Sequence, residues 1–168
     1  MKEAREPKGP ERPTPLELIK LRSVANYQFG KGIGELLFPI DVMVVRSKST
    51  GRMKYIYHGG KLLATLRPKD GLLALTLHGA ERILRNAKGA RLKVKVSEEA
   101  ARHAAEGKNI FAKHVVEADR GLRPQDDVII VDERGSLVAV GRAVLSGEEM
   151  EAFGRGVAVK VRKGVKEL

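Results

Sequence analysis

Two short stretches of the chain carry residue types whose spacing suits the binding of a phosphodiester or of a nucleic-acid chain end. In residues 107–113, GKNIFAK, a glycine that ends an expected helix leads basic and amide groups into an expected strand. Backbone N–H groups and two ammonium groups then face one place. In residues 160–164, KVRKG, the alternation of a strand places Lys160 and Arg162 on one face. The two stretches form one cationic site if the strands that carry them are neighbours.

Each stretch also has a simpler interpretation, an ordinary solvated strand edge whose lysines discourage pairing with another sheet. Other candidate groups are explained by their positions. Asp126-Asp127 falls in an expected turn, and Glu148-Glu149 in the first turn of an expected helix, where the helix dipole favours anions. The glycines of residues 30–34, GKGIG, lack the spacing of a phosphate loop and instead allow a sharp turn. We therefore expect no catalytic residue.

The histidines lack the spacings of metal-binding motifs, so we expect no metal site and no cofactor. They are His58, His78, His103 and His114. We place His58 in a turn and His78 at the start of a helix, where both are solvated. Contact between phosphate and either of these two side chains is the alternative.

The overall charge favours a polyanionic partner. The 168 residues contain 32 Lys and Arg against 21 Asp and Glu, a net charge of +11. The excess is concentrated in residues 21–90, which hold 12 Lys and Arg against 4 Asp and Glu. Nucleic acid is the expected partner of such a surface. An anionic membrane surface would favour a Lys-rich amphipathic helix, which we do not find, and a charge-rich thermophile protein is the remaining alternative.

Composition excludes several other classes. The chain has no cysteine, which excludes a disulfide framework, a thiolate zinc site, an iron–sulfur cluster and a cysteine nucleophile. No segment approaches the run of about 18 apolar residues that a membrane span needs. The first 15 residues lack the apolar core of a secretory signal. We therefore expect a cytoplasmic protein that makes no membrane contact.

The order of expected elements indicates two units. Residues 1–13 predict a flexible tail, and Thr14 to Glu17 has the pattern of a capping box that starts a helix. Beyond Asp41 the hydrophobic period becomes two, which predicts short strands and then a short helix. The strands cover residues 42–45, 52–57, 61–66 and 72–77, and the helix covers residues 80–86. We interpret residues 14–89 as a basic α+β domain.

In the second unit, residues 90–168, the pattern predicts short strands and two capped helices. The expected strands cover residues 91–96, 110–116, 127–131, 137–145 and 157–162. Ser97 and Ser146 are typical helix caps, and Gly141 inside a strand suggests a bulge. Short strands at this spacing favour a small β barrel.

Four segments of the second unit, in order, strongly resemble a PUA domain, the RNA-binding pseudobarrel of pseudouridine synthases and archaeosine transglycosylases. They are residues 107–113, 122–128, 137–143 and 155–160. The first unit resembles the domain that precedes PUA in archaeal tRNA-guanine transglycosylase and in its archaeosine synthase paralogue. The segments that carry this resemblance are residues 27–32, 37–39, 49–52 and 66–72. Together the two resemblances cover nearly all of the chain past residue 15.

The resemblance implies which residues contact RNA. In that family the PUA domain grips the acceptor end of tRNA through the loop after its first helix, the following strand and the last strand. The matching residues here are Gly107, Lys108, Asn109, Lys113, Lys160, Arg162 and Lys163, with Arg155 as a further candidate. The enzymes of the family also carry a TIM-barrel-type catalytic domain with an Asp nucleophile and a Cys/His zinc site. This chain has neither the length for that barrel nor a cysteine for that zinc, so we expect no enzymatic activity.

The sequence thus predicts an RNA-binding protein, and we favour the acceptor stem and 3′ end of tRNA. Its expected role is a non-catalytic subunit or accessory factor in archaeosine-type tRNA modification, with a separate transglycosylase or synthase subunit as candidate partner. The alternatives are a translation- or ribosome-associated factor that binds rRNA or initiator tRNA, and a small enzyme acting on RNA. Removing Lys113 and Arg162 is expected to weaken binding without unfolding, because both should lie on the surface.

Overall fold

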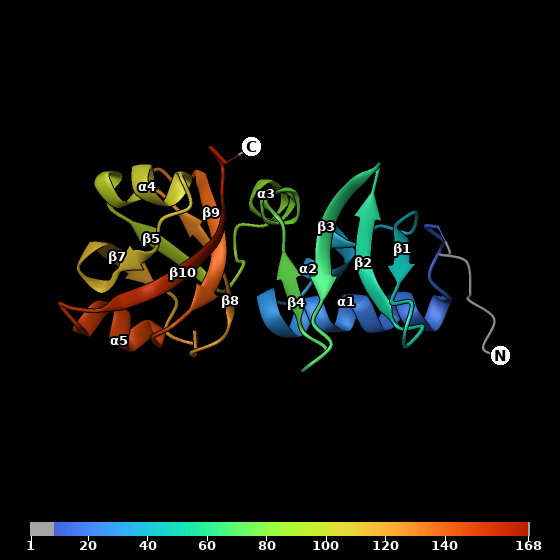
Figure 1. Cartoon of the computed structure of the whole chain (residues 1–168). Helices are drawn as coiled ribbons and strands as arrows, with labels where there is room; N and C mark the ends of the chain where they lie inside the picture. The colour runs from blue at the N-terminus through green and yellow to red at the C-terminus, as the bar shows by residue number, and fades with distance from the viewer. Residues whose placement is uncertain (1–8, 168) are drawn as a thin grey trace.

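The computed structural model describes residues 9–167, which form two β-sheet domains side by side (Figure 1). Within these residues the helices are α1 (Pro15–Phe29), α2 (Ile33–Leu37), α3 (Leu77–Asn86), α4 (Glu98–Ala105), η1 (Ala112–His114, a 3-10 turn) and α5 (Gly147–Ala152). The strands are β1 (Met43–Arg46), β2 (Met53–His58), β3 (Lys61–Leu66), β4 (Leu73–Leu75), β5 (Lys93–Val96), β6 (Ile110–Phe111), β7 (Val115–Ala118), β8 (Asp127–Val131), β9 (Leu137–Ala143) and β10 (Val157–Gly164). None of these helices is long and apolar enough to cross a membrane.

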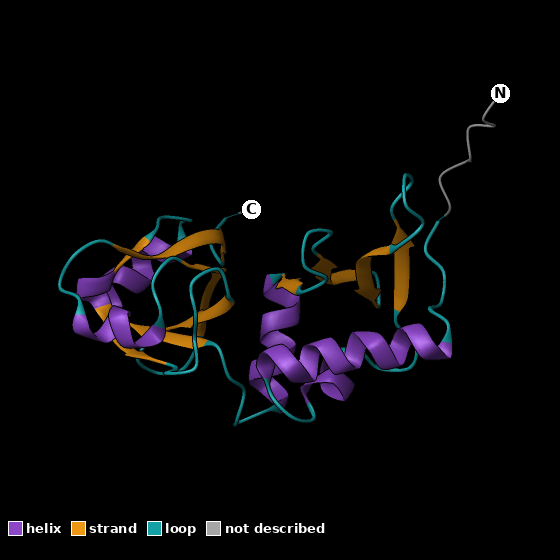
Figure 2. Ribbon diagram, turned by 90° about the horizontal axis from the view of Figure 1, so that it is seen from below, coloured by secondary structure: helices purple, strands orange, loops and turns teal. Residues whose placement is uncertain are grey.

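The N-terminal domain is an antiparallel sheet in the order β1-β2-β3-β4, lined along one face by α1. Figure 2 shows α1 running the length of this domain. The helix turns Leu21, Ala25 and Phe29 inward at spacings of four residues, and all three are buried. Ile56 of β2 is fully buried in the same core. Burial of this apolar face holds the helix against the sheet.

The start of α1 is held to β1 by a cluster of charged side chains. Thr14 and Glu17 form the capping box that the sequence predicts. The carboxylate of Glu17 also accepts two hydrogen bonds of 2.7 Å from the guanidinium of Arg46 on β1. The same guanidinium lies 2.5 Å from Glu11, whose backbone pairs with Val44 of β1. Residues 1–8 of the predicted flexible tail lie outside the described residues, but Glu11 is tied to the sheet.

We expect Glu17→Gln to lower the free energy of unfolding by about 1–2 kcal/mol at neutral pH. The hydrogen bonds from Arg46 lower the pKa of Glu17 to about 2 from its ordinary value of 4.5. Because the folded-state value is the lower one, this stabilisation is complete above about pH 4.5 and is lost as the pH falls towards 2. Urea unfolding of both proteins across this range measures the effect. Gln keeps the capping box, so a deficit of the same size at every pH would contradict this origin.

The C-terminal domain is a six-stranded sheet in the order β6-β10-β9-β8-β5-β7. Only the β5–β8 pair among these is parallel. The two edge strands, β6 and β7, are joined directly by η1, so the sheet curls into a nearly closed barrel with α4 and α5 packed outside it (Figure 1). The predicted fold class, a small α+β domain followed by a β pseudobarrel, is confirmed.

Local details of the barrel differ from the sequence-based expectation. The single strand predicted over residues 110–116 is split into β6 and β7 by η1, because the chain passes from the β10 edge to the β5 edge at this point. Gly141 does stand beside a bulge, but the extra residue lies on the facing strand: Val161 of β10 pairs with Gly141 and Lys163 with Val140, so the register of β10 shifts between them. A side chain at Gly141 would collide with the backbone carbonyl of Lys160, and the glycine therefore permits close approach of β9 and β10.

Candidate nucleic-acid interface

The loop after α4 lies against β10. Ser97 caps the start of α4, and Gly107 ends it in a left-handed conformation with φ of 92°. The side-chain oxygen of Asn109 then accepts a 3.1 Å hydrogen bond from the backbone N–H of Val161. Lys108, the residue before Asn109, is exposed. The structure therefore brings together the two stretches that the sequence singled out.

The middle of β10 presents further lysines on its surface. Lys160 and Lys163 are exposed. Val161 is paired with Gly141 and Lys163 with Val140, so Arg162 is an extra residue that forms a bulge. The bulge interrupts the alternation that the sequence pattern assumes, and Lys163, which follows the extra residue, is exposed.

Lys113 and Arg155 lie at the other end of β10. Lys113 is exposed on η1. The N–H of Ala112 donates a 2.9 Å hydrogen bond to the carbonyl of Gly156, which follows Arg155 in the loop before β10. Because a strand rises about 3.3 Å per residue, the cations from this end of β10 to Lys163 extend over about 20 Å. The candidate residues thus form an elongated strip along one strand, which we call the β10 strip: Gly107, Lys108, Asn109, Lys113, Arg155, Lys160 and Lys163.

Most cations of the β10 strip are available to an anion. Within the part of the chain that the structure describes, Lys113, Arg155, Lys160 and Lys163 form no ion pair. Lys108 lies 3.8 Å from Glu106, and both side chains are well exposed. Such a surface pair contributes little, so a phosphate can replace the carboxylate.

Arg162 has a different environment from the one that the sequence predicts. Its side chain is 38% exposed, but its guanidinium donates a 2.7 Å hydrogen bond to the fully buried carboxylate of Asp127. It also donates a 2.5 Å bond to the carbonyl of Leu75 in β4 of the other domain. The N–H of Leu75 in turn donates to Asp127 at 2.9 Å. Arg162 therefore connects the two domains, which corrects the expectation of a free cation on the strand surface.

The electrostatics of this contact depend on both partners. Burial raises the pKa of the Asp127 carboxyl above its ordinary value, and the charge and hydrogen bonds of Arg162 oppose that shift. The sequence pattern places Asp127 where an expected turn meets an expected strand and gives no sign of its burial. Its complete burial follows from the packing of the second domain against the first, which involves residues far apart in the chain.

Two exposed aromatic side chains near the strip are not among the predicted site residues. Phe111 of β6 is 46% exposed and is paired with Val157 of β10. Phe153, just before the loop that carries Arg155, is 47% exposed. The low aromatic content argues against serial stacking, but single exposed rings beside cations suit contact with an unpaired base. In the sequence, Phe111 lies between Lys108 and Lys113, and this position is the feature from which Phe111 could have been predicted as a site residue.

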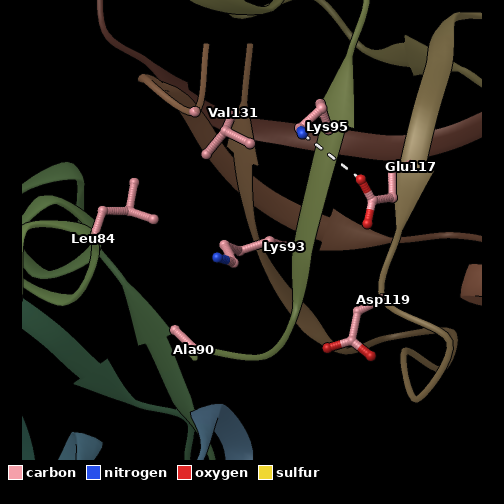
Figure 3. Close-up of a pocket in the computed structure, with 8 residues that line it drawn as sticks. Leu84, Ala90, Lys93, Lys95, Glu117, Asp119 and Val131 are labelled. Atoms are coloured by element: carbon pink, nitrogen blue, oxygen red, sulfur yellow. Dashed lines mark ion pairs between the residues drawn. The ribbon is translucent and has the colours of Figure 1, made fainter. Parts of the chain in front are cut away.

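A pocket of about 330 Å³ opens where the two domains meet (Figure 3). Leu84 of α3 faces it from one side, and the charged residues of β5 and the β7 region from the other. Lys95 and Glu117 are 3.6 Å apart, and the carboxylate of Asp119 accepts two backbone hydrogen bonds of 2.9 Å. Two cations and two anions line this pocket, so its charge is balanced. Within residues 9–167 no cluster of His, Asp or Glu could hold a metal ion.

Both domains match known families. Residues 20–89 match the patch-forming domain C2 of tRNA-guanine transglycosylase, and residues 92–165 match the PUA domain. These matches confirm the two-part resemblance that the sequence motifs indicate.

The sequence relatives are much longer than this chain. It is 44% identical over 148 residues to the tRNA-guanine(15) transglycosylase of Methanothermobacter thermautotrophicus, and 46% identical over 145 residues to that of Thermococcus kodakarensis. The alignments cover 88% and 86% of this chain but only 23% and 25% of those proteins. The chain therefore spans about a quarter of the length of the curated relatives that it matches.

Solved structures of similar size share the whole fold. A hypothetical protein from Pyrococcus horikoshii superposes with a TM-score of 0.76 at 22% identity, covering 95% of this chain and 96% of that one. A conserved PUA domain protein from Thermoplasma acidophilum superposes with a TM-score of 0.70 at 22% identity, covering 95% of both chains. At this level of identity the similarity establishes the two-domain fold.

Proposed function

We propose that this chain, which is a PUA domain protein related to the C-terminal region of archaeal tRNA-guanine(15) transglycosylase, binds RNA along the β10 strip. One observation supports this best. Exposed lysines of the α4–β6 loop and of η1 lie along β10, the strand that carries Lys160 and Lys163. Ammonium groups along a strip about 20 Å long suit successive phosphates of a folded backbone.

The RNA that we propose is tRNA, bound at its acceptor stem and 3′ end. The relatives act on tRNA by name, and the region that matches this chain includes the PUA domain. Double-stranded RNA is recognised mainly by its shape, its phosphates and its 2′-hydroxyl groups, which a strip of lysines can contact without base readout. The exposed rings of Phe111 and Phe153 then offer stacking surfaces for the unpaired bases at the 3′ end.

The role that we propose is that of a non-catalytic RNA-binding subunit in archaeosine-type tRNA modification. The match covers the C2 and PUA region, whereas about three quarters of each related enzyme has no counterpart in this chain. A separate transglycosylase or synthase polypeptide would supply the chemistry. Co-purification of this chain with its cellular partners tests this role. A transglycosylase-like polypeptide that elutes together with this chain supports it. Recovery of ribosomal particles alone would favour a translation-associated factor instead.

We expect the double substitution Lys108→Ala with Lys163→Ala to weaken the binding of unfractionated tRNA about 10- to 100-fold. Both side chains are exposed, so the melting temperature should stay the same. Filter binding at several salt concentrations provides a second readout. The slope of log K against log salt should become shallower by about two, one for each lost phosphate contact.

The matched control is Lys48→Ala, which removes an exposed lysine in the turn between β1 and β2 of the other domain. It should change neither the affinity nor the salt slope appreciably. A wild-type affinity that does not respond to salt would reject the proposed binding mode.

A further inference from the structure

A cationic hollow, separate from the β10 strip, lies in the N-terminal domain between the β2–β3 turn and α3. It has a volume of about 370 Å³, and we call it the hairpin pocket. The side chains that line it and can donate hydrogen bonds are those of His58, Lys61, His78, Arg82, Arg85 and Asn86. Glu81 is the one acidic residue in its lining. Three permanent cations against one carboxylate make the pocket attractive to an anion.

Some of these donors are already engaged, and others are available. Arg85 forms an ion pair of 2.8 Å with Glu81, and His58 lies 3.0 Å from Asp41. Arg82 uses its Nε atom to donate to a backbone carbonyl at 2.6 Å, which leaves its terminal nitrogens available. Among the residues that the structure describes, Lys61 and His78 have exposed side chains with no ion pair or hydrogen-bond partner.

The fold fixes the backbone at the start of α3, and thereby the position of His78 at the pocket. Thr76 caps α3 by accepting a hydrogen bond from the N–H of Gly79, and its hydroxyl donates to the carbonyls of Leu62 and Leu63 on β3. Gly79 packs so closely on Leu63 that a side chain there would collide with the Leu63 carbonyl. These contacts start α3 at Leu77 rather than at the expected residue 80, and His78 lies in its first turn, at the helix start where the sequence places it.

One side of the hairpin pocket, the start of α3, lies near β10. Leu75, whose carbonyl accepts the guanidinium of Arg162 on β10, precedes His78 by only three residues. Helix α3 and helix α4 both contact β9, and the two helices lie at the same edge of the molecule in Figure 1. The start of α3, which carries His78, therefore lies close to the point where Arg162 of β10 contacts the N-terminal domain.

We propose that the hairpin pocket binds a phosphate group of the same RNA, through Lys61, His78 and the terminal nitrogens of Arg82. This inference rests on the proposed function and extends the RNA contact from the C-terminal to the N-terminal domain. A phosphodiester carries the single negative charge that the uncommitted cations can neutralise, and its oxygens accept from ammonium, imidazole and guanidinium donors alike. The pocket also accounts for part of the positive charge concentrated in residues 21–90.

The test compares Lys61→Ala and His78→Ala with wild type in filter binding of unfractionated tRNA across a range of salt concentrations. Lys61→Ala should weaken binding about three- to tenfold and reduce the salt slope by about one. His78→Ala should also weaken the binding of tRNA. The matched control is again Lys48→Ala, because Lys48 lies in the turn at the opposite end of β2 from the hairpin pocket. Thermal melting of each variant establishes that the fold is retained.

The outcomes separate this inference from the function on which it rests. If Lys61→Ala binds tRNA like Lys48→Ala while Lys108→Ala with Lys163→Ala still binds poorly, the hairpin pocket is not a phosphate site and the β10 strip remains one. If wild type itself does not retain tRNA, both proposals are overturned. A loss confined to Lys61→Ala and His78→Ala, with the strip variant unaffected, would support the pocket and reject the strip.

Discussion

Replacing Arg162 with alanine is expected to lower the free energy of unfolding by about 3–5 kcal/mol. The substitution removes the cation that faces Asp127, whose side chain is completely buried. A buried carboxylate without its partner is costly, because the protein interior solvates charge poorly. The bond to the Leu75 carbonyl is lost too, so the contact between the domains weakens. Urea denaturation at neutral pH measures the loss.

Two controls identify the cause of this loss. Lys160→Ala removes a cation two positions earlier on the same strand, where the side chain is exposed, and should change stability by less than about 0.5 kcal/mol. The deficit of Arg162→Ala should also shrink as the pH is lowered, because burial raises the pKa of Asp127 and protonation then relieves the unpaired charge. Equal stability of Arg162→Ala and Lys160→Ala would show that the pair with Asp127 contributes nothing.

Because of this pair, loss of RNA binding in Arg162→Ala would not identify a contact with RNA. The sequence-based expectation joins Arg162 with Lys113 as residues that can be removed without unfolding. We retain that expectation for Lys113, whose side chain is exposed on η1. For Arg162 we expect instead that the substitution destabilises the fold. The lysines of the β10 strip are therefore the residues on which the binding test should rely.

Replacing Gly164 with alanine should destabilise the protein by about 2–3 kcal/mol and weaken tRNA binding with it. A Cβ at this position would collide with the backbone carbonyls of Ala104 and Ala105 at the end of α4. Relief of the collision requires α4 to move away from β10, and the loop that holds Lys108 moves with it. Chemical denaturation and filter binding with tRNA should change together.

Gly154→Ala is the matched substitution for this experiment. A Cβ added at Gly154 would meet no heavy atom within 4 Å, and the backbone there does not have a positive φ. Alanine should therefore be tolerated to within about 0.5 kcal/mol. If Gly164→Ala is as stable as Gly154→Ala, helix α4 is not packed against β10 as closely as described. If it is unstable yet binds tRNA normally at low temperature, the position of the loop does not matter for RNA.

Local patterns in the sequence are sufficient to predict much of the fold. Thr14 with Glu17 and Ser146 with Glu149 form the two capping boxes expected from their spacing. The strand expected to return from the turn at residues 58–60 is β3, and its bounds, Lys61–Leu66, are the predicted ones. These features depend on hydrogen bonds and side-chain directions within a few residues, and such interactions are encoded by spacing alone. The motifs of the second unit also indicate the PUA domain, which the family match confirms.

Contacts between distant residues decided the rest. Arg162 meets Asp127 across 35 residues and Leu75 across 87, and no periodicity links such positions. The hairpin pocket likewise forms only when the β2–β3 turn packs near α3, which begins beyond β4. By itself the sequence determined which residues are basic, where helices start and which family motifs are present. Tertiary structure decided which cations remain free, because a charge is committed or available according to what the folded chain buries beside it.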